Sequence, residues 1–477
     1  MRRPYSFLTV LSDGDKEQIY QTALRILEEI GIQVLHDKTV ALLQEAGCVM
    51  EGEGERIVKI PASLVRQAIT SAPKNIPVFD REGTHVMDLG GYRSYFGTGS
   101  DLMYTVDSEH FERRRCMLDD VRRAARVCDA LPNLDFIMSF AHPLDISPSQ
   151  SYLHSFLAMA ESSTKPIVCT AEDRDDLREM WEIARILRGS EDALIKQPYF
   201  IYYGEPSSPL KYPPYSLEKL LFCAEKRVPC IYSPAPIAGS TAPMTIAGHV
   251  AQGLAESLGG LVIHQLKAPG APFLMGMGPA VLDMMTSQSS YNAPEYYLAY
   301  LGMIEMSHYV DLPCWGYAGT SDSQIPDEQA TLESGMLTFI ATMAGANLNH
   351  DVGYLNFGLT GSLEMIVITD EIIDQIRRLK RGIPVDEETL AFDVIREVGH
   401  EGHHLLHPHT LKHLRATQWR PILISRKGYD QWEQEGRMTL LDRARHRLQH
   451  LLDHHQPTAI AAPILQELWQ RVKDFPG

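Results

Sequence analysis

The sequence has 477 residues, 44% of them hydrophobic and 22% charged, which is enough for a large buried core. Its formal net charge of −17 argues against nucleic-acid binding, because an acidic surface repels phosphate backbones. The N-terminal segment has only a short apolar run, and no stretch reaches the ~18–20 apolar residues of a membrane helix. We therefore expect a cytoplasmic protein without a membrane contact, and reduced cysteines, since none of the seven has CxxC spacing.

The first 75 residues show the apolar pattern of helices. Apolar residues recur with a helical period over residues 15–31, and similar patterns follow over 37–48 and 61–71. Gly31 can end the first helix, and Pro61 lies in a first turn, where a helix tolerates proline. We expect residues 1–75 to form a helical N-terminal extension.

From there to residue 385, short β-rich runs alternate with helical stretches. The predicted strands are 92–98, 134–140, 166–171, 198–204, 229–235, 271–277, 312–318 and 347–355. The predicted helices are 117–129, 149–162, 173–187, 216–226, 244–266, 292–308, 326–346 and 362–380. Eight strands alternating with eight helices predict an α/β fold with a (β/α)8 TIM barrel over residues 76–385; an open doubly wound sheet is the alternative.

The remaining residues, 386–477, are helical in pattern, charged and rich in histidine. We expect a C-terminal helical extension that packs on the barrel or mediates assembly into a homo-oligomer. Six histidines lie between His400 and His413, which is dense enough for a metal site. Their spacing is irregular and no cysteine is near, so structural or substrate-rim histidines are the favoured interpretation, and we expect no bound metal.

In a barrel of this kind the active site lies where the strands end. The residues that follow the predicted strands are rich in glycine, polar groups and aromatic rings. Aromatic rings with one or two carboxylates would hold a cation that has no proton to donate, although core packing is the usual role of a single ring. Glycines at 97–99 and 276–278 are interpreted as tight strand-to-helix turns, and neither GxSxG nor HExxH occurs.

Several segments, in order along most of the chain, carry a family resemblance. The longest is AGANLNHDVGYLNFGLTGSLEMIVITDEII (344–373), supported by FGTGSD (96–101), EPSSPL (205–210), AGSTAPMTIAG (238–248), NAPEYYL (292–298), TSDSQIPDEQA (320–330) and GHHLLHPHTLKHLR (402–415). Together they resemble the trimethylamine methyltransferase superfamily, which implies a (β/α)8 barrel. Where pyrrolysine-containing members have Gly-pyrrolysine-Thr, this sequence has Gly358-Leu359-Thr360. The chain is thus similar to the branch without pyrrolysine, whose members demethylate glycine betaine and related quaternary amines.

The resemblance implies an enzyme that moves a methyl group from a quaternary amine, glycine betaine foremost, to the Co(I) corrinoid of a partner protein. The corrinoid nucleophile is external, so no residue of this chain is expected to act as nucleophile, base or metal ligand. Two alternatives remain: a metal-assisted corrinoid methyltransferase with another methyl donor, and a non-catalytic binding protein for quaternary amines.

Roles follow for the residues at the strand ends. Rings that would surround the trimethylammonium group are Phe96, Tyr104, Tyr354 and Phe357. Asp101 and Glu205 would add negative potential. His350, with Thr98, would hold a substrate carboxylate, and Asp351 would orient His350. Leu359 is expected to fill the space of the missing pyrrolysine. Met277, Pro279, Met284 and Met285 follow the sixth predicted strand and could form an apolar surface for the corrinoid. For Met284 and Met285, helix core is the favoured interpretation.

Overall fold

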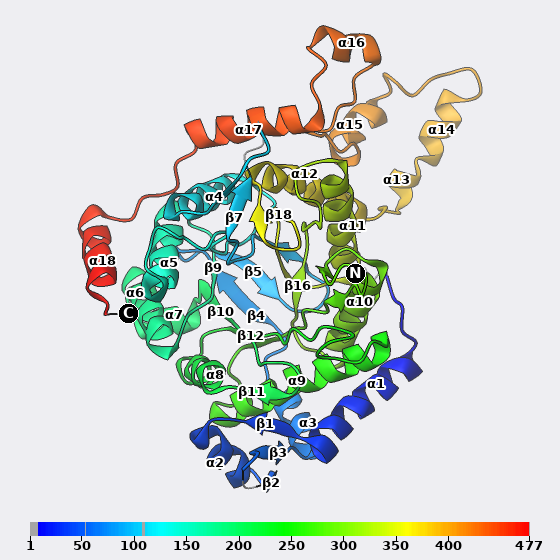
Figure 1. Cartoon of the computed structure of the whole chain (residues 1–477). Coiled ribbons are helices and arrows are strands. Elements are labelled where there is room, and N and C mark those ends of the chain that lie inside the picture. Colours follow the sequence, from blue (N-terminus) through cyan, green and yellow to red (C-terminus); the bar gives the residue numbers. More distant parts are fainter. Residues whose placement is uncertain (1–7, 53, 107–109, 477) are drawn as a thin grey trace.

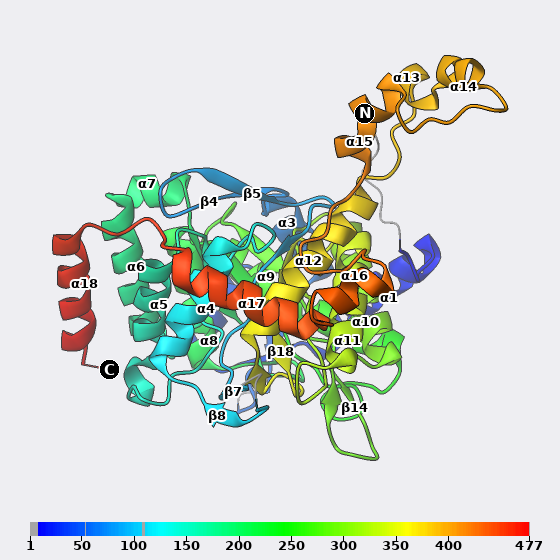
Figure 2. The same cartoon turned by 90° about the horizontal axis from the view of Figure 1, so that it is seen from above.

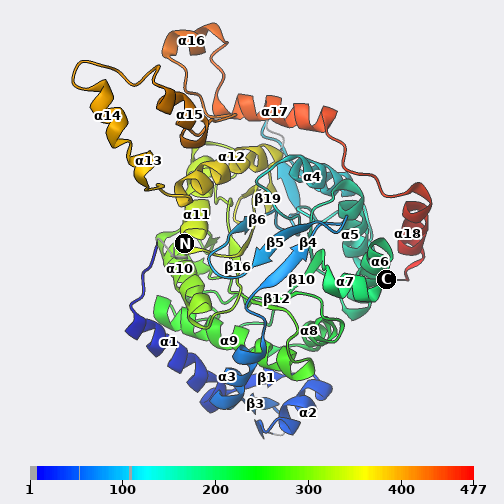
Figure 3. The same ribbon diagram turned by 180° about the vertical axis from the view of Figure 1, so that it is seen from behind.

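The computed structural model describes residues 8–52, 54–106 and 110–476, and its fold is mixed α/β. Short parallel strands occupy the centre, and long helices surround them (Figures 1 and 3). All eight predicted helices are present: α4 (Leu118–Ala130), α5 (Ser151–Ser162), α6 (Arg174–Arg188), α8 (Pro214–Lys226), α9 (Ile246–Lys267), α10 (Pro294–Tyr309), α11 (Glu328–Ala344) and α12 (Leu363–Lys380). A short helix, α7 (Glu191–Lys196), was not predicted.

The central strands form two parallel sheets. One has the order β13-β12-β10-β9, and the other has the order β16-β17-β6. Their bounds are β6 (Tyr95–Phe96), β9 (Ile167–Cys169), β10 (Phe200–Gly204), β12 (Cys230–Tyr232), β13 (Phe273–Met275), β16 (Trp315–Tyr317) and β17 (Leu348–His350).

Single parallel bridges connect the two sheets. Met275 pairs with Cys314, and the predicted strand 134–140 has only bridges, from Phe136 to Gly97 and from Ile137 to Ile167. Seven of the eight predicted strands are therefore strands. The ladder of hydrogen bonds is not continuous around all eight, so the fold agrees with the barrel prediction only in its parallel strands and surrounding helices.

Local sequence explains where the helices begin and end. Asp173 accepts hydrogen bonds from the first-turn amides of α6, and Asp327 does the same for α11. Gly189 and Gly345 follow these two helices in the left-handed conformation that glycine adopts without strain. Helix α9 is long and apolar enough to cross a membrane, but 78% of its apolar window is buried, so it is a core helix.

A hairpin closes one end of the space between the strands. It consists of β4 (Ile76–Phe79) and β5 (His85–Leu89), which were not predicted. Its apolar residues pack into one cluster with the inward-facing side chains of the central strands: Ile76, Val78, Met87, Leu89, Phe136, Val168, Ile201, Ile231, Leu274, Trp315 and Leu348. Figure 2 shows this hairpin on the opposite side of the molecule from the hairpins of β7 (Tyr104–Val106) with β8 (Arg113–Arg115) and of β14 (Val281–Leu282) with β15 (Ser289–Ser290). Only the carboxyl ends of the strands remain free to build a site.

The N-terminal segment was predicted to be helical, but it also contains three strands. The helices α1 (Asp13–Arg25), η1 (Ile26–Ile30), α2 (Asp37–Glu45) and α3 (Ala62–Ser71) are joined by β1 (Ile32–Val34), β2 (Val49–Glu51) and β3 (Ile57–Lys59). These strands form a sheet of order β11-β1-β3-β2 with β11 (Lys211–Tyr212). Each of the three is only three residues long, which is too short for an alternating pattern to be recognised in sequence.

The C-terminal segment divides into a packed part and a protruding part. Helix α17 (Leu440–His454) packs on α12 and α4, and α18 (Ala462–Asp474) packs on α5. Between α12 and α17 the chain leaves the body of the protein as an arm, residues 383–437, with α13 (Glu387–Leu390), α14 (Phe392–Val398), α15 (Pro408–Thr417) and α16 (Tyr429–Gln434). Figure 2 shows α13, α14 and α15 standing away from the other helices.

Candidate functional site

Four aromatic rings gather on the neighbouring strands β16 and β17 and on β10 across from them. The Trp315 and His350 rings stack with centroids 4.2 Å apart, and the Tyr317 ring lies 4.5 Å from that of His350. Tyr203 reaches across from β10 to within 5.5 Å of Trp315 and 6.2 Å of His350. We call these four residues the ring cluster. Aromatic faces carry negative potential, so such a cluster attracts cations.

Strand geometry places these rings on one face. Side chains alternate along a strand, so residues 315 and 317 on β16 face the same way, as do 201 and 203 on β10. Ile201, Trp315 and Leu348 belong to the interior cluster closed by the hairpin. Trp315 is thus part of that interior, level with Leu348, and Tyr203, Tyr317 and His350 lie one alternation above it, toward the free end of the strands.

Glycines in the same alternating positions leave room for the rings. A Cβ atom added at Gly276 would lie 3.1 Å from Cβ of Trp315, and one at Gly278 would lie 2.7 Å from the Tyr317 hydroxyl. A Cβ at Gly99 would overlap Oδ1 of Asp351 and the Tyr354 hydroxyl. None of these glycines has a positive φ, so the prediction of tight turns was wrong, and close packing is what requires glycine there.

Three carboxylates stand around the rings: Asp101, Glu205 and Asp351. The Tyr203 hydroxyl donates a hydrogen bond to Oε2 of Glu205 over 3.1 Å. Desolvation raises the pKa of Glu205, and the charge of Asp101 raises it further, while the Tyr203 hydrogen bond acts in the opposite direction. Glu205 is nonetheless exposed, and this combination is expected of a group that lines a recess open to solvent.

Asp351 connects the carboxylates to the rings. Its Oδ1 lies 2.6 Å from Nδ1 of His350, close enough for an ion pair when the ring is protonated. Asp351 and Asp101 both have left-handed backbone, with φ of 76° and 67°, a conformation that costs energy in residues other than glycine. Strained backbone is concentrated at functional sites, and here it falls on two of the three carboxylates.

The tyrosines at this site are held as neutral phenols. Burial raises the pKa of Tyr317 well above its usual value, and the negative charge of Asp351 adds to the effect. Burial and Asp351 act in the same way on the pKa of Tyr354 and of Tyr291, which follows β15. The shared influence of Asp351 places all three phenols near one carboxylate.

Five of the predicted site residues come together here: Asp101, Glu205, His350, Asp351 and Tyr354. Tyr354 lies on β18 (Tyr354–Leu355), and its hydroxyl donates to the backbone oxygen of Ser100. The predicted set thus contains the charges around the rings but only His350 of the ring cluster.

Two predicted cage rings lie elsewhere. Phe96 is fully buried on the helix side of β6, where the Arg377 guanidinium lies 5.4 Å from its ring centroid. It faces outward because Tyr95, its neighbour on the strand, faces the interior. The Tyr104 ring on β7 is covered by the Arg113 guanidinium at 4.2 Å. The structure therefore corrects the placement of both residues in a cage.

Thr98, Leu359 and Phe357 also differ from their predicted roles. The Thr98 hydroxyl both donates to and accepts from the backbone of Met138, at 3.0 Å each, so it is not free to hold a carboxylate. Leu359 is 46% exposed between β18 and β19 (Thr360–Gly361), so it fills no interior space. Phe357 is half-buried. Among the described residues, its ring makes no contact with the four rings of the cluster.

Three rings of the cluster were missed: Tyr203, Trp315 and Tyr317. The signal was present, because each lies two residues from another interior position on its strand. These rings lie on inward-facing positions within the strands, not in the loops after them.

Three histidines of the arm, His407, His409 and His413, contact each other or a glutamate. The rings of His409 and His413 lie 4.3 Å apart, and Nε2 of His413 lies 3.0 Å from a Glu388 carboxylate oxygen. His407 lies 3.5 Å from Glu397. Within the described ranges, no three histidine, cysteine or acidic side chains are grouped as metal ligands would be.

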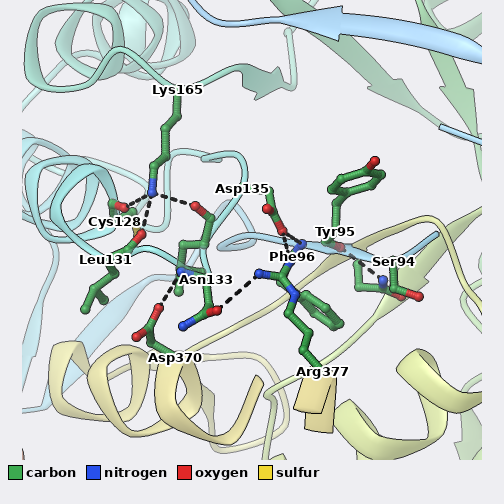
Figure 4. A network of polar contacts seen from close by, with 12 residues as sticks. Ser94, Tyr95, Phe96, Cys128, Leu131, Asn133, Asp135, Lys165, Asp370 and Arg377 are labelled. Carbon is green, nitrogen blue, oxygen red and sulfur yellow. Dashed lines mark hydrogen bonds and ion pairs between the residues drawn. The ribbon is translucent and has the colours of Figure 1, made fainter. Parts of the chain in front are cut away.

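A second polar network lies at the other ends of the strands (Figure 4). Arg377 of α12 contacts the Asp135 carboxylate at 2.6 Å, and that carboxylate accepts a hydrogen bond from the Phe96 amide. Lys165 donates to three backbone oxygens, among them those of Cys128 and Leu131 at the end of α4. A cation on the carbonyl end of a helix stabilises that helix. This network joins α4 and α12 to the strands, and its role is structural.

Comparison with known proteins supports a single family. The family model described as trimethylamine methyltransferase (MTTB) matches residues 1–474. The trimethylamine methyltransferase MttB of Desulfitobacterium hafniense (strain DSM 10664 / DCB-2) is 29% identical over 98% of this chain and 94% of its own length. The glycine betaine methyltransferase of Desulfitobacterium hafniense (strain Y51) is also 29% identical, over 94% of each chain.

Among solved structures, the crystal structure of the Methanosarcina barkeri monomethylamine methyltransferase (MtmB) resembles this fold. The TM-score is 0.54, with 14% sequence identity, over 93% of this chain and 88% of that chain. At this identity the likeness concerns the fold alone, and it agrees with the central parallel strands and their surrounding helices.

Proposed function

This chain belongs to the trimethylamine methyltransferase (MTTB) family, whose enzymes methylate corrinoid proteins, and we propose that its own methyl donor is a quaternary amine. The observation that carries the proposal is the ring cluster with Asp101, Glu205 and Asp351 around it. A quaternary ammonium group has no proton to donate, so ring faces and nearby negative charge are its natural partners.

The chemistry needs little from the protein beyond placement. The C–N bond breaks, nitrogen keeps the electron pair and leaves as a tertiary amine, and the methyl carbon bonds to the Co(I) corrinoid of the partner, which is the methyl acceptor. Because the nitrogen carries a full charge before the reaction, the leaving amine needs no proton. The ring cluster orients the methyl group toward the open end of the strands, and the buried aromatic surface excludes water.

Glycine betaine is the donor that we propose first. Leu359 occupies the position that corresponds to pyrrolysine in the pyrrolysine-containing members, and leucine has no electrophilic group with which to activate a tertiary amine. One curated relative at 29% identity is a glycine betaine methyltransferase. The alternatives are metal-assisted transfer from another donor and a binding protein that has lost the transfer reaction.

We further propose that the eight parallel segments are the wall of a (β/α)8 barrel over residues 76–385, flanked by extensions 1–75 and 386–477. The single bridges that join the two sheets support this topology. The rim at the free end carries Met284 and Met285 on the β14–β15 hairpin, 62% and 92% exposed. They are not helix core and could face a corrinoid, whereas Met277 is buried against α9 and could not.

The arm supports the proposal of a homo-oligomer. Phe392 and Ile395 on α14 are 70% and 58% exposed, which is unusual for large apolar side chains of a monomer. At the base of the arm, residues including Ile383, Val385 and Leu414 line a groove of about 1100 Å³. An apolar ridge and an apolar groove on one arm are self-complementary, as a twofold interface between copies requires.

The seven cysteines are buried and unpaired, which agrees with the proposed cytoplasmic location.

The test is methyl transfer in solution. Purified protein is mixed with reduced cob(I)alamin, alone or on a corrinoid protein, and with glycine betaine or trimethylamine, while absorbance reports methylcob(III)alamin. The proposal expects methylation with glycine betaine and none with trimethylamine. Methylation with trimethylamine alone would contradict the assignment of the donor. Binding of quaternary amines without transfer to any corrinoid protein would favour the binding protein.

A further inference from the structure

Three buried nitrogen atoms of the ring cluster lack a hydrogen-bond partner among the described residues: Nε1 of Trp315 and both Nδ1 and Nε2 of His350. Nδ1 of His350 does lie 2.6 Å from Oδ1 of Asp351, so Nε1 of Trp315 and Nε2 of His350 are the two that remain to be explained. Trp315 is 2% exposed and His350 is 8% exposed, so bulk water does not solvate them freely. Buried polar groups are nearly always paired, and an exception inside a functional site calls for an explanation.

The chemistry of the two groups points to an acceptor. The indole nitrogen can only donate a hydrogen bond. Nδ1 of His350 lies 2.6 Å from Oδ1 of Asp351, so the other ring nitrogen, Nε2, is the one left for a ligand. Nε2 donates a hydrogen bond whenever it carries a proton. The stacked rings can therefore offer two donors to one acceptor, from adjacent strands.

An unpartnered histidine nitrogen in the helix layer does not share this setting. Nε2 of His264, for example, is on helix α9, where the ring packs against Phe273, and burial lowers the pKa of that histidine to about 3. That ring is neutral and lies in the helix layer. Trp315 and His350 instead lie beside Tyr203, which is hydrogen-bonded to the exposed Glu205.

We propose that Trp315 and His350 bind the carboxylate of a zwitterionic quaternary amine, while its cationic end lies against the Tyr203 and Tyr317 rings and toward Glu205 and Asp101. This inference rests on the proposed function and specifies the class of donor: a betaine, with a carboxylate a few bonds from the ammonium group. The sequence analysis paired His350 with Thr98 to hold the carboxylate, but the Thr98 hydroxyl is already hydrogen-bonded to Met138. In this proposal Trp315 takes the place of Thr98. A carboxylate that accepts from the indole N–H of Trp315 and from the Nε2–H of His350 satisfies both nitrogens at once.

The experiment compares ligands with and without a carboxylate in the absence of any corrinoid. Calorimetry measures the affinities of glycine betaine, choline and tetramethylammonium for the wild-type protein and for Trp315→Phe. This variant keeps an aromatic ring but removes the N–H group. Trp181→Phe is the matched control, because Trp181 is buried in the helix layer, with its ring against Phe222.

We expect Trp315→Phe to weaken glycine betaine about ten- to hundredfold, as for loss of a hydrogen bond to a charged group. Tetramethylammonium, which has no acceptor, should change by less than about threefold, and this result also shows that the variant is folded. Trp181→Phe should change neither. Equal losses for the two ligands, or no loss, would overturn the carboxylate anchor. Failure of all three ligands to bind the wild-type protein would instead contradict the proposed function itself.

Discussion

Tyr317 and His350 are register partners on the neighbouring parallel strands β16 and β17, and their ring centroids lie 4.5 Å apart. Partners in parallel register face the same side, so these rings point together into the space between the strands. His350 also stacks on Trp315, one alternation earlier along β16. The Tyr317 ring is thus the one nearest the open end of β16.

Replacing Tyr317 with leucine should weaken the binding of quaternary ammonium ions. A single cation–π contact contributes about 0.5–2 kcal/mol, which corresponds to roughly two- to thirtyfold in affinity. Tyr317→Phe keeps the ring face and should bind nearly as the wild-type protein does. Titration calorimetry with tetramethylammonium measures the effect.

Tyr104→Leu is the control for this substitution. Sequence analysis placed Tyr104 in the cage, but the Arg113 guanidinium covers its ring. Its loss should leave the affinity for tetramethylammonium unchanged. A larger effect at Tyr104 than at Tyr317 would restore the sequence-based cage and remove the ring cluster.

Much of the fold could be predicted because long helices have a strong periodic signal. Helix α9, with 22 residues, and α12, with 18, were predicted to within a few residues at each end. The hairpin β4–β5 lies between the predicted N-terminal helices, which end by residue 75, and the first predicted strand at 92–98, and no element was predicted there. What fixes its place is contact with Ile201, Leu274 and other residues far along the chain, which no local pattern contains.

Cation binding should weaken as the pH is lowered through the pKa of Glu205. Desolvation raises that pKa, so protonation begins at a higher pH than for an ordinary glutamate. The charged form that attracts the cation is present above the raised pKa and is lost below it. Affinity for tetramethylammonium, measured from pH 8 downward, should therefore fall in the wild-type protein.

Glu205→Gln should bind more weakly at pH 8 and should lose less affinity on acidification. Glu82→Gln is the control, because Glu82 follows β4, away from the ring cluster, and pairs with Arg81 at 3.0 Å. A Glu205→Gln variant with the full wild-type pH profile would show that another group is responsible.

Replacing Gly99 with alanine should disrupt the site without a change in charge. The added Cβ would overlap the Asp351 carboxylate and the Tyr354 hydroxyl, so both side chains must move. We expect a loss of amine affinity of at least about tenfold, measured by calorimetry. Gly335→Ala on α11 is the control, because a Cβ there meets nothing within 4 Å. It should keep full affinity and gain about 0.5–1 kcal/mol of stability.

The site could be predicted in part because charged residues after strands stand out in a sequence. Asp101, Glu205 and Asp351 each follow a strand and were found in that way. Tyr203, Trp315 and Tyr317 lie within strands among other apolar residues, where burial in the core is the usual outcome. That Tyr203 and Tyr317 lie at the open end, above Ile201 and Trp315 of their own strands, depends on how β10 and β16 are brought together in the fold.

Charged substitutions on α14 of the arm should reduce self-association. Phe392→Glu with Ile395→Glu replaces two exposed apolar side chains, so the folded chain should be little affected. Light scattering should report a smaller particle than for the wild-type protein, with the melting temperature of the body retained. Leu332→Glu on α11, 67% exposed, is a control for added charge. An unchanged mass for the α14 variant would exclude that helix from the interface.

Asp176 should make the stability of the protein depend on pH in an unusual direction. This carboxylate is 2% exposed in the first turn of α6, and burial raises its pKa to about 6. A group whose pKa is higher in the folded protein than in the unfolded chain favours folding when it is protonated. Its contribution is fully present below about pH 4 and is lost as the pH rises through 6.

Asp176→Asn should therefore stabilise the protein at pH 7.5. Raising the pKa of an aspartate from about 4 to about 6 destabilises the folded protein at pH 7.5 by about 3 kcal/mol. The substitution also removes a favourable charge at the helix N-terminus, which reduces the gain in stability by about 0.3–1 kcal/mol. Denaturant unfolding at pH 7.5 and at pH 4 measures the difference, which should vanish at the lower pH. Asp175→Asn removes a neighbouring, exposed charge that pairs with Arg178, so it should not stabilise at either pH. Equal effects of Asp176→Asn at the two pH values would mean that packing, rather than the buried charge, sets its contribution.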